Sequence, residues 1–482
     1  MKILFVCQYF YPEVFRGNDI AFHWAEEGHE VHVVTGIPNY PDGVFHKGYG
    51  WFKKNHETLV CGNVNDNDNH NLGSNTNRTN NTNNQSRICE LENSTSKDSK
   101  NAKGGVLKIT RLPIVPRGNN KVMLMLNYFS YLIVAWVYML FHAIGHKYDR
   151  VFVQQLSPVM MSAPGVLYKR LRGVPLYTWV LDLWPESLTA AGGITNKYVL
   201  AFFRHYVKSE YKHSDKILVS SRSFEKSILE YGDYKDKILY YPQWADGGTN
   251  TNRTNNTNTS HTESTDNTEI STSKDSKNAE LSTDSKLSTL NSQLPVLPEG
   301  FRMMFAGAVG EAHGFECTME AARLTKEHKE IKWIVVGDGR KLEWVREYVK
   351  EHGLEETVYT LGRFPAETMP WFFAQADVML VTLSDDPLFK LYAPAKISSY
   401  MAAGKPIMAV LNGEGAEVIR DADCGWMLPA GDAEGFAKLA VELSQTDKKV
   451  LEEKGQNALK YYEANYVKEK SLGKLDDLMG IK

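Results

Sequence analysis

One strand–helix–strand unit near the C-terminus constrains the fold most strongly, because its helix has a marked beginning and end. Apolar runs at 378–383 and 407–411 have the length and composition of buried parallel strands. Between them, Pro394 suits the first helical position, and Gly404 and Pro406 stop the helix. The pattern predicts a parallel α/β sheet with a short crossover helix.

The same unit predicts an anion-binding site. In a parallel sheet, the loop after a strand delivers the N-terminus of the next helix, whose free backbone N–H groups attract anions. Pro394, Ala395 and Lys396 open this helix, so a lysine ammonium adds positive charge there. A diphosphate fits this arrangement. An ordinary crossover helix with a solvated lysine is the alternative.

Length and composition indicate two globular domains. The chain has 482 residues, too many for one core, and 42% of them are hydrophobic, which is enough for two cores. We expect Rossmann-like domains at 1–246 and 294–447 and a helical segment at 448–482 that crosses back to the first domain. The predicted architecture is α/β, with two doubly wound domains that face each other across a cleft.

Two segments interrupt this pattern. Residues 62–103 and 247–293 are rich in Asn, Ser and Thr. Two strings of the first segment recur letter for letter in the second: 75–83 at 250–258, and 94–102 at 271–279. Such composition buries too little apolar surface to fold, so we predict disordered low-complexity inserts that are dispensable for the chemistry.

Charge and cysteine usage narrow the classes of function. The formal net charge is −3, which gives no reason to expect a nucleic-acid binder. The five cysteines include no C-x-x-C pair, which indicates a reducing compartment and no structural zinc site. Because the first apolar run is too short for a signal-peptide core, we expect a cytoplasmic protein.

The loop after the first strand is one candidate for ligand contact. Gly17 can bring the backbone close to a ligand, and Asn18 or Asp19 can cap the helix that opens there. The apolar run at 31–36 then supplies a second strand, which completes a β-α-β opening. A plain turn explains the same residues, and a single glycine favours this simpler interpretation.

Two later strands place polar residues at the same edge of the predicted sheet. The strand at 150–155 is followed by Ser157, and the strand at 175–181 by Asp182 and Trp184. The carboxyl ends of parallel strands meet at one edge, so both tips should face one cleft. An N-cap role for Asp182 at the turn that follows is the alternative.

A long uncharged run suggests contact with a membrane. Residues 122–145 contain no Asp, Glu, Lys or Arg and are flanked by Arg117 and Lys121 before the run and Lys147 after it. About 20 apolar residues suffice to span a bilayer, but several Asn, Ser, Tyr and His side chains interrupt this run. We predict a helix that packs on the sheet with one face against lipid, a peripheral contact; a spanning helix is the alternative.

Five motifs occur in an order that points to one family. They are the first strand with Arg16-Gly17-Asn18-Asp19, Asp182-Leu183-Trp184-Pro185-Glu186, Phe305-Ala306-Gly307 leading to Gly310, Val336-Gly337-Asp338-Gly339, and Pro394-Ala395-Lys396 through Pro406 followed by Gly413-Glu414-Gly415-Ala416-Glu417. With this set the chain resembles the family 4 glycosyltransferases of GT-B fold. Within them it resembles the bacterial L-fucosamine transferases of O-antigen and capsule biosynthesis. The resemblance covers nearly the whole chain apart from the two inserts.

The resemblance implies transfer of a sugar from a UDP-sugar to a lipid-linked glycan acceptor, with retention at the anomeric carbon and without a metal or other cofactor. The implied sugar is an N-acetylated deoxyhexosamine such as L-FucNAc. The C-terminal domain would bind the nucleotide sugar and the N-terminal domain the acceptor. The enzyme would be peripheral on the cytoplasmic face of the inner membrane.

The resemblance also assigns roles to residues. Asp182 would orient the acceptor hydroxyl, Lys396 would balance the charge on the leaving diphosphate, and Glu417 would bind the ribose. The residues implied in donor binding are Gly17, Gly307, Gly337, Gly339, Pro394, Ala395, Lys396, Gly413 and Glu417. Those implied in acceptor binding are Asn18, Asp19, Asp182 and Trp184.

The chain departs from the family pattern at four positions. The usual glutamates spaced eight apart fall on Leu391 and Ser399. The usual arginine and lysine after the first strand of the nucleotide domain fall on Ala308 and His313. A protonated His313 would replace the lysine in part.

These losses keep two other functions open. A nucleotide-sugar isomerase of the 2-epimerase type would need acid–base carboxylates in the cleft, which the missing glutamates disfavour. A catalytically impaired nucleotide-sugar-binding protein would explain the losses directly. Arg340 and Lys341, beside the 337–339 turn, are candidate substitutes for the missing cations, and solvated charges at a helix start are the alternative.

Overall fold

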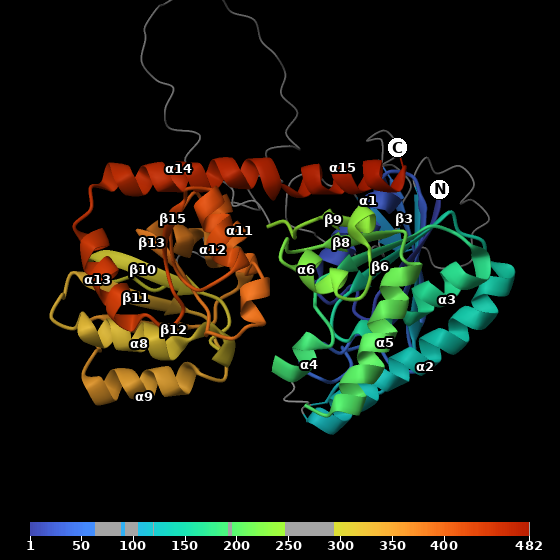
Figure 1. Cartoon of the computed structure of the whole chain (residues 1–482), viewed down its shortest axis with the longest axis horizontal. Helices are drawn as coiled ribbons and strands as arrows, with labels where there is room; N and C mark the ends of the chain where they lie inside the picture. Colours follow the sequence, from blue (N-terminus) through green and yellow to red (C-terminus); the bar gives the residue numbers. More distant parts are fainter. Residues whose placement is uncertain (63–87, 92–104, 119, 191–194, 246–293, 482) are drawn as a thin grey trace, which may run out of the picture. The chain divides into compact units, whose positions relative to one another are not determined.

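The computed structural model describes residues 1–62, 88–91, 105–118, 120–190, 195–245 and 294–481 (Figure 1). The chain divides into two compact units. Unit 1 contains Met1–Gln243 and Glu469–Lys482, and unit 2 contains Trp244–Lys468. Nearly all of the two predicted inserts, 62–103 and 247–293, lies outside the described residues.

Unit 1 is built on a sheet whose described strands number nine, in the order β4-β3-β5-β2-β1-β6-β7-β8-β9. The pairs from β5 to β9 are parallel, whereas β3 runs antiparallel to both β5 and β4. The strands are β1 (Lys2–Val6), β2 (Glu30–Gly36), β3 (His56–Gly62), β4 (Ile88–Leu91), β5 (Gly105–Leu112), β6 (Arg150–Gln155), β7 (Leu176–Val180), β8 (Lys216–Val219) and β9 (Ile238–Tyr240).

Strand β4 departs from the sequence analysis, which expected no structure in 62–103. It pairs with β3 in a register that sets Leu59 opposite Leu91 and Cys61 opposite Cys89. A short run with two apolar residues can add to an existing sheet edge although its neighbours in sequence are polar. Cys61 is disulfide-bonded, which is at odds with the reducing compartment expected from the cysteine pattern, whereas Cys7, Cys317 and Cys424 are free thiols.

The helices of unit 1 connect these strands. They are α1 (Arg16–Glu26), α2 (Lys121–Gly145), η2 (Val159–Ser162), α3 (Ala163–Arg172), α4 (Glu186–Ala190), α5 (Lys197–His213), α6 (Phe224–Leu229), η3 (Lys235–Lys237) and α15 (Lys468–Met479). The C-terminal helix is fixed to α1 through Asp476, which accepts a hydrogen bond of 2.9 Å from the indole N–H of Trp24. Asp476 also lies 2.9 Å from Nε2 of His23.

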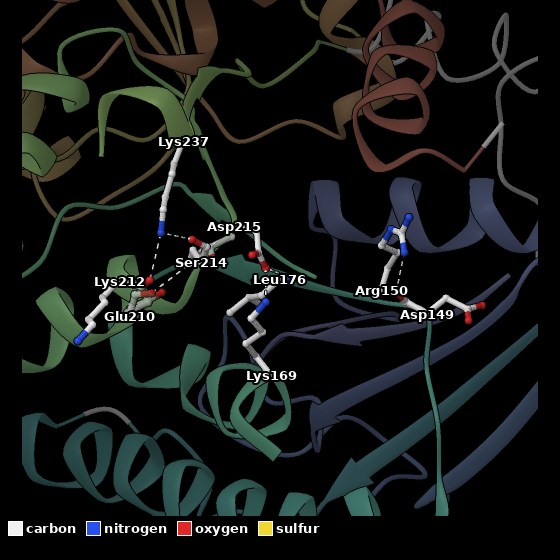
Figure 2. Close-up of polar contacts among 10 residues, drawn as sticks. Asp149, Arg150, Lys169, Leu176, Glu210, Lys212, Ser214, Asp215 and Lys237 are labelled. Atoms are coloured by element: carbon white, nitrogen blue, oxygen red, sulfur yellow. Dashed lines mark hydrogen bonds and ion pairs between the residues drawn. The ribbon is translucent and has the colours of Figure 1, made fainter. Parts of the chain in front are cut away.

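A polar cluster fastens the end of α5 to its surroundings (Figure 2). Asp215 accepts a hydrogen bond of 2.7 Å from the backbone N–H of Leu176 at the start of β7. It also forms an ion pair with Lys169 of α3, with an N–O distance of 2.7 Å. Lys237 donates to the Ser214 carbonyl oxygen at 2.8 Å. These bonds tie α3, the end of α5, β7 and η3 together.

Helix α2 packs one face into unit 1. Tyr131, Ala135, Met139 and Ala143 recur at helical spacing, are buried and belong to the core that contains β1, β2 and β6. By length and composition alone, Val122–Gly145 is long and apolar enough to cross a membrane.

Unit 2 is built on a parallel sheet whose described strands number six, in the order β12-β11-β10-β13-β14-β15. The strands are β10 (Phe301–Ala306), β11 (Ile331–Val336), β12 (Val358–Gly362), β13 (Val378–Thr382), β14 (Ile407–Val410) and β15 (Gly425–Leu428). The helices are η5 (Glu311–His313), α8 (Phe315–Leu324), α9 (Leu342–His352), η6 (Ala366–Thr368), α10 (Met369–Gln375), η7 (Phe389–Leu391), α11 (Ala395–Ala402), α12 (Glu414–Asp421), α13 (Ala433–Ser444) and α14 (Lys448–Asn465).

Each sheet has a point where the strand order reverses. In unit 1 the chain moves from β1 to β2 on one side and later to β6 on the other, and in unit 2 β10 lies between β11 and β13. Ligands of open parallel sheets bind at the carboxyl ends of the strands at such a point. The predicted fold class of two parallel-sheet α/β domains is confirmed.

Candidate functional site

The candidate donor site lies in unit 2 at the carboxyl ends of β10 and β13. The predicted helix is present as α11, with Pro394 at its N-cap, one position earlier than expected. Gly307 directly follows β10, and its φ of 140° falls in the region that favours glycine. The first turn of α11 places Lys396 against this glycine, because a Cβ atom on Gly307 would lie 3.3 Å from Nζ of Lys396. Two predicted donor residues are therefore neighbours.

The Lys396 ammonium is buried without a hydrogen-bond partner in the described part of the chain. Its Nζ lies 3.7 Å from the centre of the Phe305 ring, a cation–π contact. Burial lowers the pKa of Lys396 to about 7. An unpaired buried cation is costly unless an anion joins it, so this geometry favours an anionic ligand.

The His313 ring packs against the Phe305 ring in a T-shaped arrangement. The two ring centres are 5.4 Å apart, and Nδ1 of His313 is 3.4 Å from the Thr382 carbonyl oxygen at the end of β13. Burial, followed by the positive charge of Lys396, lowers the pKa of His313 to about 4. The imidazole is therefore neutral at pH 7. Burial and then the charge of Lys396 thus disfavour a protonated His313 in the free protein, and its replacement of the missing lysine stays a prediction.

Gly337 and Gly339 support the site through backbone packing. Both have positive φ angles, 146° and 155°. A Cβ atom on Gly337 would overlap the Gly307 carbonyl oxygen, and one on Gly339 would overlap the Val309 carbonyl oxygen. These glycines let the turn after β11 press against the turn after β10. They hold Gly307 in position, and their direct contact with a donor stays a prediction.

The N-termini of two helices converge beside Lys396. A Cβ atom on Gly415, in the first turn of α12, would lie 3.1 Å from Cδ of Pro394, the N-cap of α11. Gly413 packs so closely on η7 that a Cβ atom there would overlap the Lys390 carbonyl oxygen. The positive ends of two helix dipoles thus lie together, which suits a diphosphate.

The two glutamates in the first turn of α12 differ in burial. Glu417, predicted to bind the ribose, is exposed in the first turn of α12, whereas Glu414 of the same turn is buried. Sequence reasoning did not single out Glu414. The sequence feature that could have pointed to Glu414 is its position directly after the Gly413 turn.

Of the two other proposed cations, Lys341 is engaged by neighbouring carboxylates and, among the described residues, Arg340 is not. Lys341 forms ion pairs with Glu316 and Glu311, the latter at 3.3 Å, and lies over the Trp344 ring. Arg340 is exposed. Lys341 as a substitute for the missing donor cations is therefore wrong, since two carboxylates already neutralise it.

In unit 1, Asp182 is held in a network of hydroxyl and indole groups. It follows β7, and one carboxylate oxygen accepts from the Ser157 hydroxyl while the other accepts from the Ser187 hydroxyl at 2.5 Å. The indole N–H of Trp184 donates to the same Ser157 hydroxyl at 2.8 Å. The strand tips after β6 and β7 do meet. Both carboxylate oxygens already accept hydrogen bonds, so Asp182 is fixed in orientation.

Gly17, Asn18 and Asp19 lie inside α1, which begins at Arg16. The expectation that Asn18 or Asp19 caps this helix is wrong, because the N-cap residue is Phe15. A Cβ atom on Gly17 would overlap Oε1 of Gln154 at the end of β6. Gly17 thus permits close packing on β6 rather than standing at an open surface.

The switch point of unit 1 carries polar atoms that sequence reasoning missed. Four buried amide oxygens have no hydrogen-bond partner among the described residues: Gln8 Oε1, Asn18 Oδ1, Gln154 Oε1 and Gln155 Oε1. Unpaired buried acceptors are rare in proteins, and ligand hydroxyls would satisfy them. The available signal was the pair of glutamines at the end of a strand.

Glu13 is a second missed residue, beside Asn18. Its Oε1 accepts from the backbone N–H groups of Asn39 at 2.7 Å and Tyr40 at 2.6 Å, and its Oε2 from that of Phe10 at 3.3 Å. Burial raises the pKa of Glu13 to about 6, although these hydrogen bonds oppose the rise. The Glu13 carbonyl oxygen accepts from the Asn18 amide at 2.6 Å.

A cavity of about 520 Å³ lies elsewhere in unit 1. It is lined by Pro12, Asp42, Val44, Phe45, His46, Lys47 and Tyr49. It contains neither Asp182 nor the unpaired amides, so the polar geometry at the strand ends identifies the candidate site. Among the described residues, no group of three or more His, Cys, Asp or Glu side chains could hold a metal ion.

Comparisons with known proteins give a family match within unit 2 and structural matches over the whole chain. Residues 300–446 match the family model described as Glycosyl transferases group 1. The chain is similar to the probable glycosyltransferase WbjE of Pseudomonas aeruginosa, at 27% identity over 56% of this chain and 61% of that protein. It is also similar to the amylovoran biosynthesis glycosyltransferase AmsK of Erwinia amylovora, at 24% identity over 32% of this chain and 39% of that protein. Both alignments span less than two thirds of the relative's own length.

Solved structures identify the fold. The Anabaena protein HepE, crystallised in complex with UDP, is similar over 100% of both chains with a TM-score of 0.58 and 12% sequence identity. At this identity the likeness concerns the fold alone, and the predicted GT-B fold class is confirmed. Residues 300–446 therefore resemble the group 1 glycosyl transferases, and the chain as a whole has a GT-B fold.

Proposed function

We propose that this protein is a glycosyltransferase of polysaccharide biosynthesis that takes its sugar from a nucleoside diphosphate sugar, a UDP-sugar. The observation that carries the proposal is the buried, unpartnered ammonium of Lys396 beside Gly307. It lies at the switch point of the domain that matches the group 1 family. The names of WbjE and AmsK and the UDP bound to HepE support the same reading.

The chemistry of the proposed step follows from charge. Transfer breaks the bond between the anomeric carbon and the diphosphate oxygen and forms a bond from that carbon to the acceptor oxygen, whose proton leaves with the diphosphate. Negative charge therefore grows on the diphosphate oxygen in the transition state. Lys396 and the paired N-termini of α11 and α12 would stabilise this charge without a metal ion. The diphosphate would in turn raise the pKa of Lys396 and keep its ammonium charged.

Acceptor binding is proposed for unit 1. The unpaired amide oxygens of Gln8, Asn18, Gln154 and Gln155 would accept hydrogen bonds from sugar hydroxyls. Asp182 would orient the attacking hydroxyl only by giving up one of its serine partners. The proposal also includes three features that the family resemblance implies. They are retention at the anomeric carbon, a lipid-linked acceptor and an N-acetylated deoxyhexosamine such as L-FucNAc as the sugar.

The experiment is UDP release by the full chain over a panel of UDP-sugars, with and without a bacterial lipid-linked saccharide. The proposal predicts release with one donor that depends on the acceptor. Conversion of a donor without any acceptor would instead favour the isomerase. Donor binding without turnover under any combination would favour the binding protein and make Leu391 and Ser399 the explanation.

A further inference from the structure

We infer that unit 1 docks on a membrane that carries anionic headgroups, through a surface formed by α2 and loop 42–54. The inference rests on the proposed function in one respect: docking would bring the enzyme to its lipid-linked acceptor, which is confined to a bilayer. Its physical basis is independent of that function. It lies in exposed apolar side chains, in the charge around them, and in the contacts that join the two segments.

The outer face of α2 forms an apolar stripe along the whole helix. Eight large hydrophobic side chains are exposed there: Val122, Leu126, Phe129, Ile133, Trp136, Val137, Phe141 and Ile144. Ile133 is 60% exposed and Phe141 is 71% exposed. A stripe from residue 122 to 144 is about 33 Å long at 1.5 Å per residue. Apolar patches of this extent mark interaction surfaces.

The opposite face of α2 is packed in the core of unit 1, so α2 cannot cross a bilayer while unit 1 is folded. Tyr131, Ala135, Met139 and Ala143 are buried in the core that contains β1 and β6. The buried polar side chain of Asn127 on this face accepts a hydrogen bond of 2.7 Å from Gln8. A helix with one face on a sheet cannot be surrounded by lipid, so it would lie in the plane of the membrane surface.

Loop 42–54 adjoins the beginning of α2. The backbone N–H of Gly118 donates to the Gly43 carbonyl oxygen at 2.8 Å, and the indole of Trp51 donates to the Ile114 carbonyl oxygen at 2.8 Å. Phe52 is 95% exposed, and Trp51 and Val44 are exposed as well. Exposed aromatic residues are typical of the interfacial zone of a bilayer.

The charge of these segments suits anionic lipid. Loop 42–54 carries the exposed lysines 47, 53 and 54 against one carboxylate, Asp42. Helices α2 and α3, which pack on each other, contain no Asp or Glu. The last turn of α3 adds Arg170 and Arg172, whereas its Lys169 is already paired with Asp215. A second copy of this chain is a poor occupant, because a symmetric contact would set these cations against each other.

The test is flotation of the full chain with vesicles of phosphatidylglycerol and phosphatidylethanolamine, compared with vesicles of phosphatidylcholine. We expect binding to the anionic vesicles that is at least tenfold stronger than to the neutral ones. The double variant Ile133→Ser/Phe141→Ser and the single variant Phe52→Ser should each lower the partition coefficient, the double variant at least tenfold. The control Val296→Ser/Val450→Ser, two exposed positions in unit 2, should stay within twofold of wild type.

Three results would overturn the inference. The first is equal vesicle binding by wild type and by Ile133→Ser/Phe141→Ser, with matching thermal unfolding. The second is resistance of the bound chain to extraction at pH 11, which would indicate a spanning helix. The third is a lipid-free dimer that the same double variant dissociates, which would make the stripe a self-association surface. None of these depends on UDP release, so failure here is distinct from failure of the proposed function.

Discussion

The ammonium nitrogen of Lys396 lies 3.7 Å from the centre of the Phe305 ring and has no hydrogen-bond acceptor in the described part of the chain. Phe305 is the next-to-last residue of β10 and is itself buried. The ring face offers the cation partial compensation for the water it has lost. The site is therefore unsatisfied without an anion, which is a cost in stability that a binding function would explain.

Lys396→Met should stabilise the free protein by roughly 1–3 kcal/mol at pH 6, because it removes a desolvated charge and retains the apolar stem. Since the pKa of Lys396 is lowered from 10.5 to about 7, the unfolded chain binds more protons between these values. The penalty is full below pH 7 and fades as the pH rises toward 10.5. Urea unfolding at pH 6 and pH 9.5 measures the difference; a destabilised variant at pH 6 would contradict it.

Donor binding should take up a proton. At pH 8 most of the free protein has a neutral Lys396, and the diphosphate of a UDP-sugar would draw a proton onto it. Calorimetry in two buffers of different ionisation enthalpy should show uptake of nearly one proton at pH 8 and much less at pH 6. Equal uptake at both values would mean that Lys396 does not titrate on binding.

Gly337→Ala should destabilise the protein by roughly 2–4 kcal/mol, because its Cβ atom would overlap the Gly307 carbonyl oxygen at a φ of 146°. Gly310→Ala is the matched control, since a Cβ atom there meets nothing within 4 Å. Chemical unfolding of both variants tests the pair. Similar stability of the two would show that the turn after β11 is free to shift.

Glu210→Gln should stabilise unit 1 above neutral pH by roughly 1–3 kcal/mol. Glu210 is buried in α5 (Figure 2), and burial raises the pKa of its carboxyl to about 8, with the Ser162 hydroxyl offsetting this only in part. Stability from this group is full below pH 4.5 and is lost as the pH rises through 8. The gain should therefore appear at pH 8.5 and shrink at pH 5.5, measured by urea unfolding.

Glu347→Gln, an exposed position on α9, is the control for Glu210→Gln and should change the free energy of unfolding by less than about 0.5 kcal/mol at either pH. A Glu210→Gln variant that is no more stable than wild type at pH 8.5 would mean that the carboxylate is solvated in solution.

The donor side could be predicted from sequence because its signals are local. Pro394, Gly404 and Pro406 bound one helix, and a helix after a parallel strand presents its N-terminus at the carboxyl edge of the sheet. Gly307 and Lys396 lie together in the structure, and their role in donor binding stays a prediction. What sequence could not show is that the ammonium loses all its water, since that depends on Phe305 and His313 from other elements.

The acceptor side was harder to predict because its contacts come from segments far apart in the chain. Asp182 reads as an open carboxylate until Ser157 and Ser187 are seen to bind it. Glu13 reads as a surface residue until the backbone of Asn39 and Tyr40 closes over it. Asn18 and Asp19 match a helix-cap pattern, but the helix begins earlier. A local sequence pattern predicts a helix or strand, but it does not show which distant residues contact its side chains.

The affinity of UDP for three forms of the full chain tests the central claim most directly. Wild type, Lys396→Ala and Lys438→Ala would be titrated at pH 7, the last being an exposed lysine on α13. The account predicts about 10- to 150-fold weaker binding for Lys396→Ala, the equivalent of roughly 1.5–3 kcal/mol for a charge-assisted contact. Lys438→Ala should match wild type. Equal affinity in all three would remove Lys396 from the donor site and contradict the account.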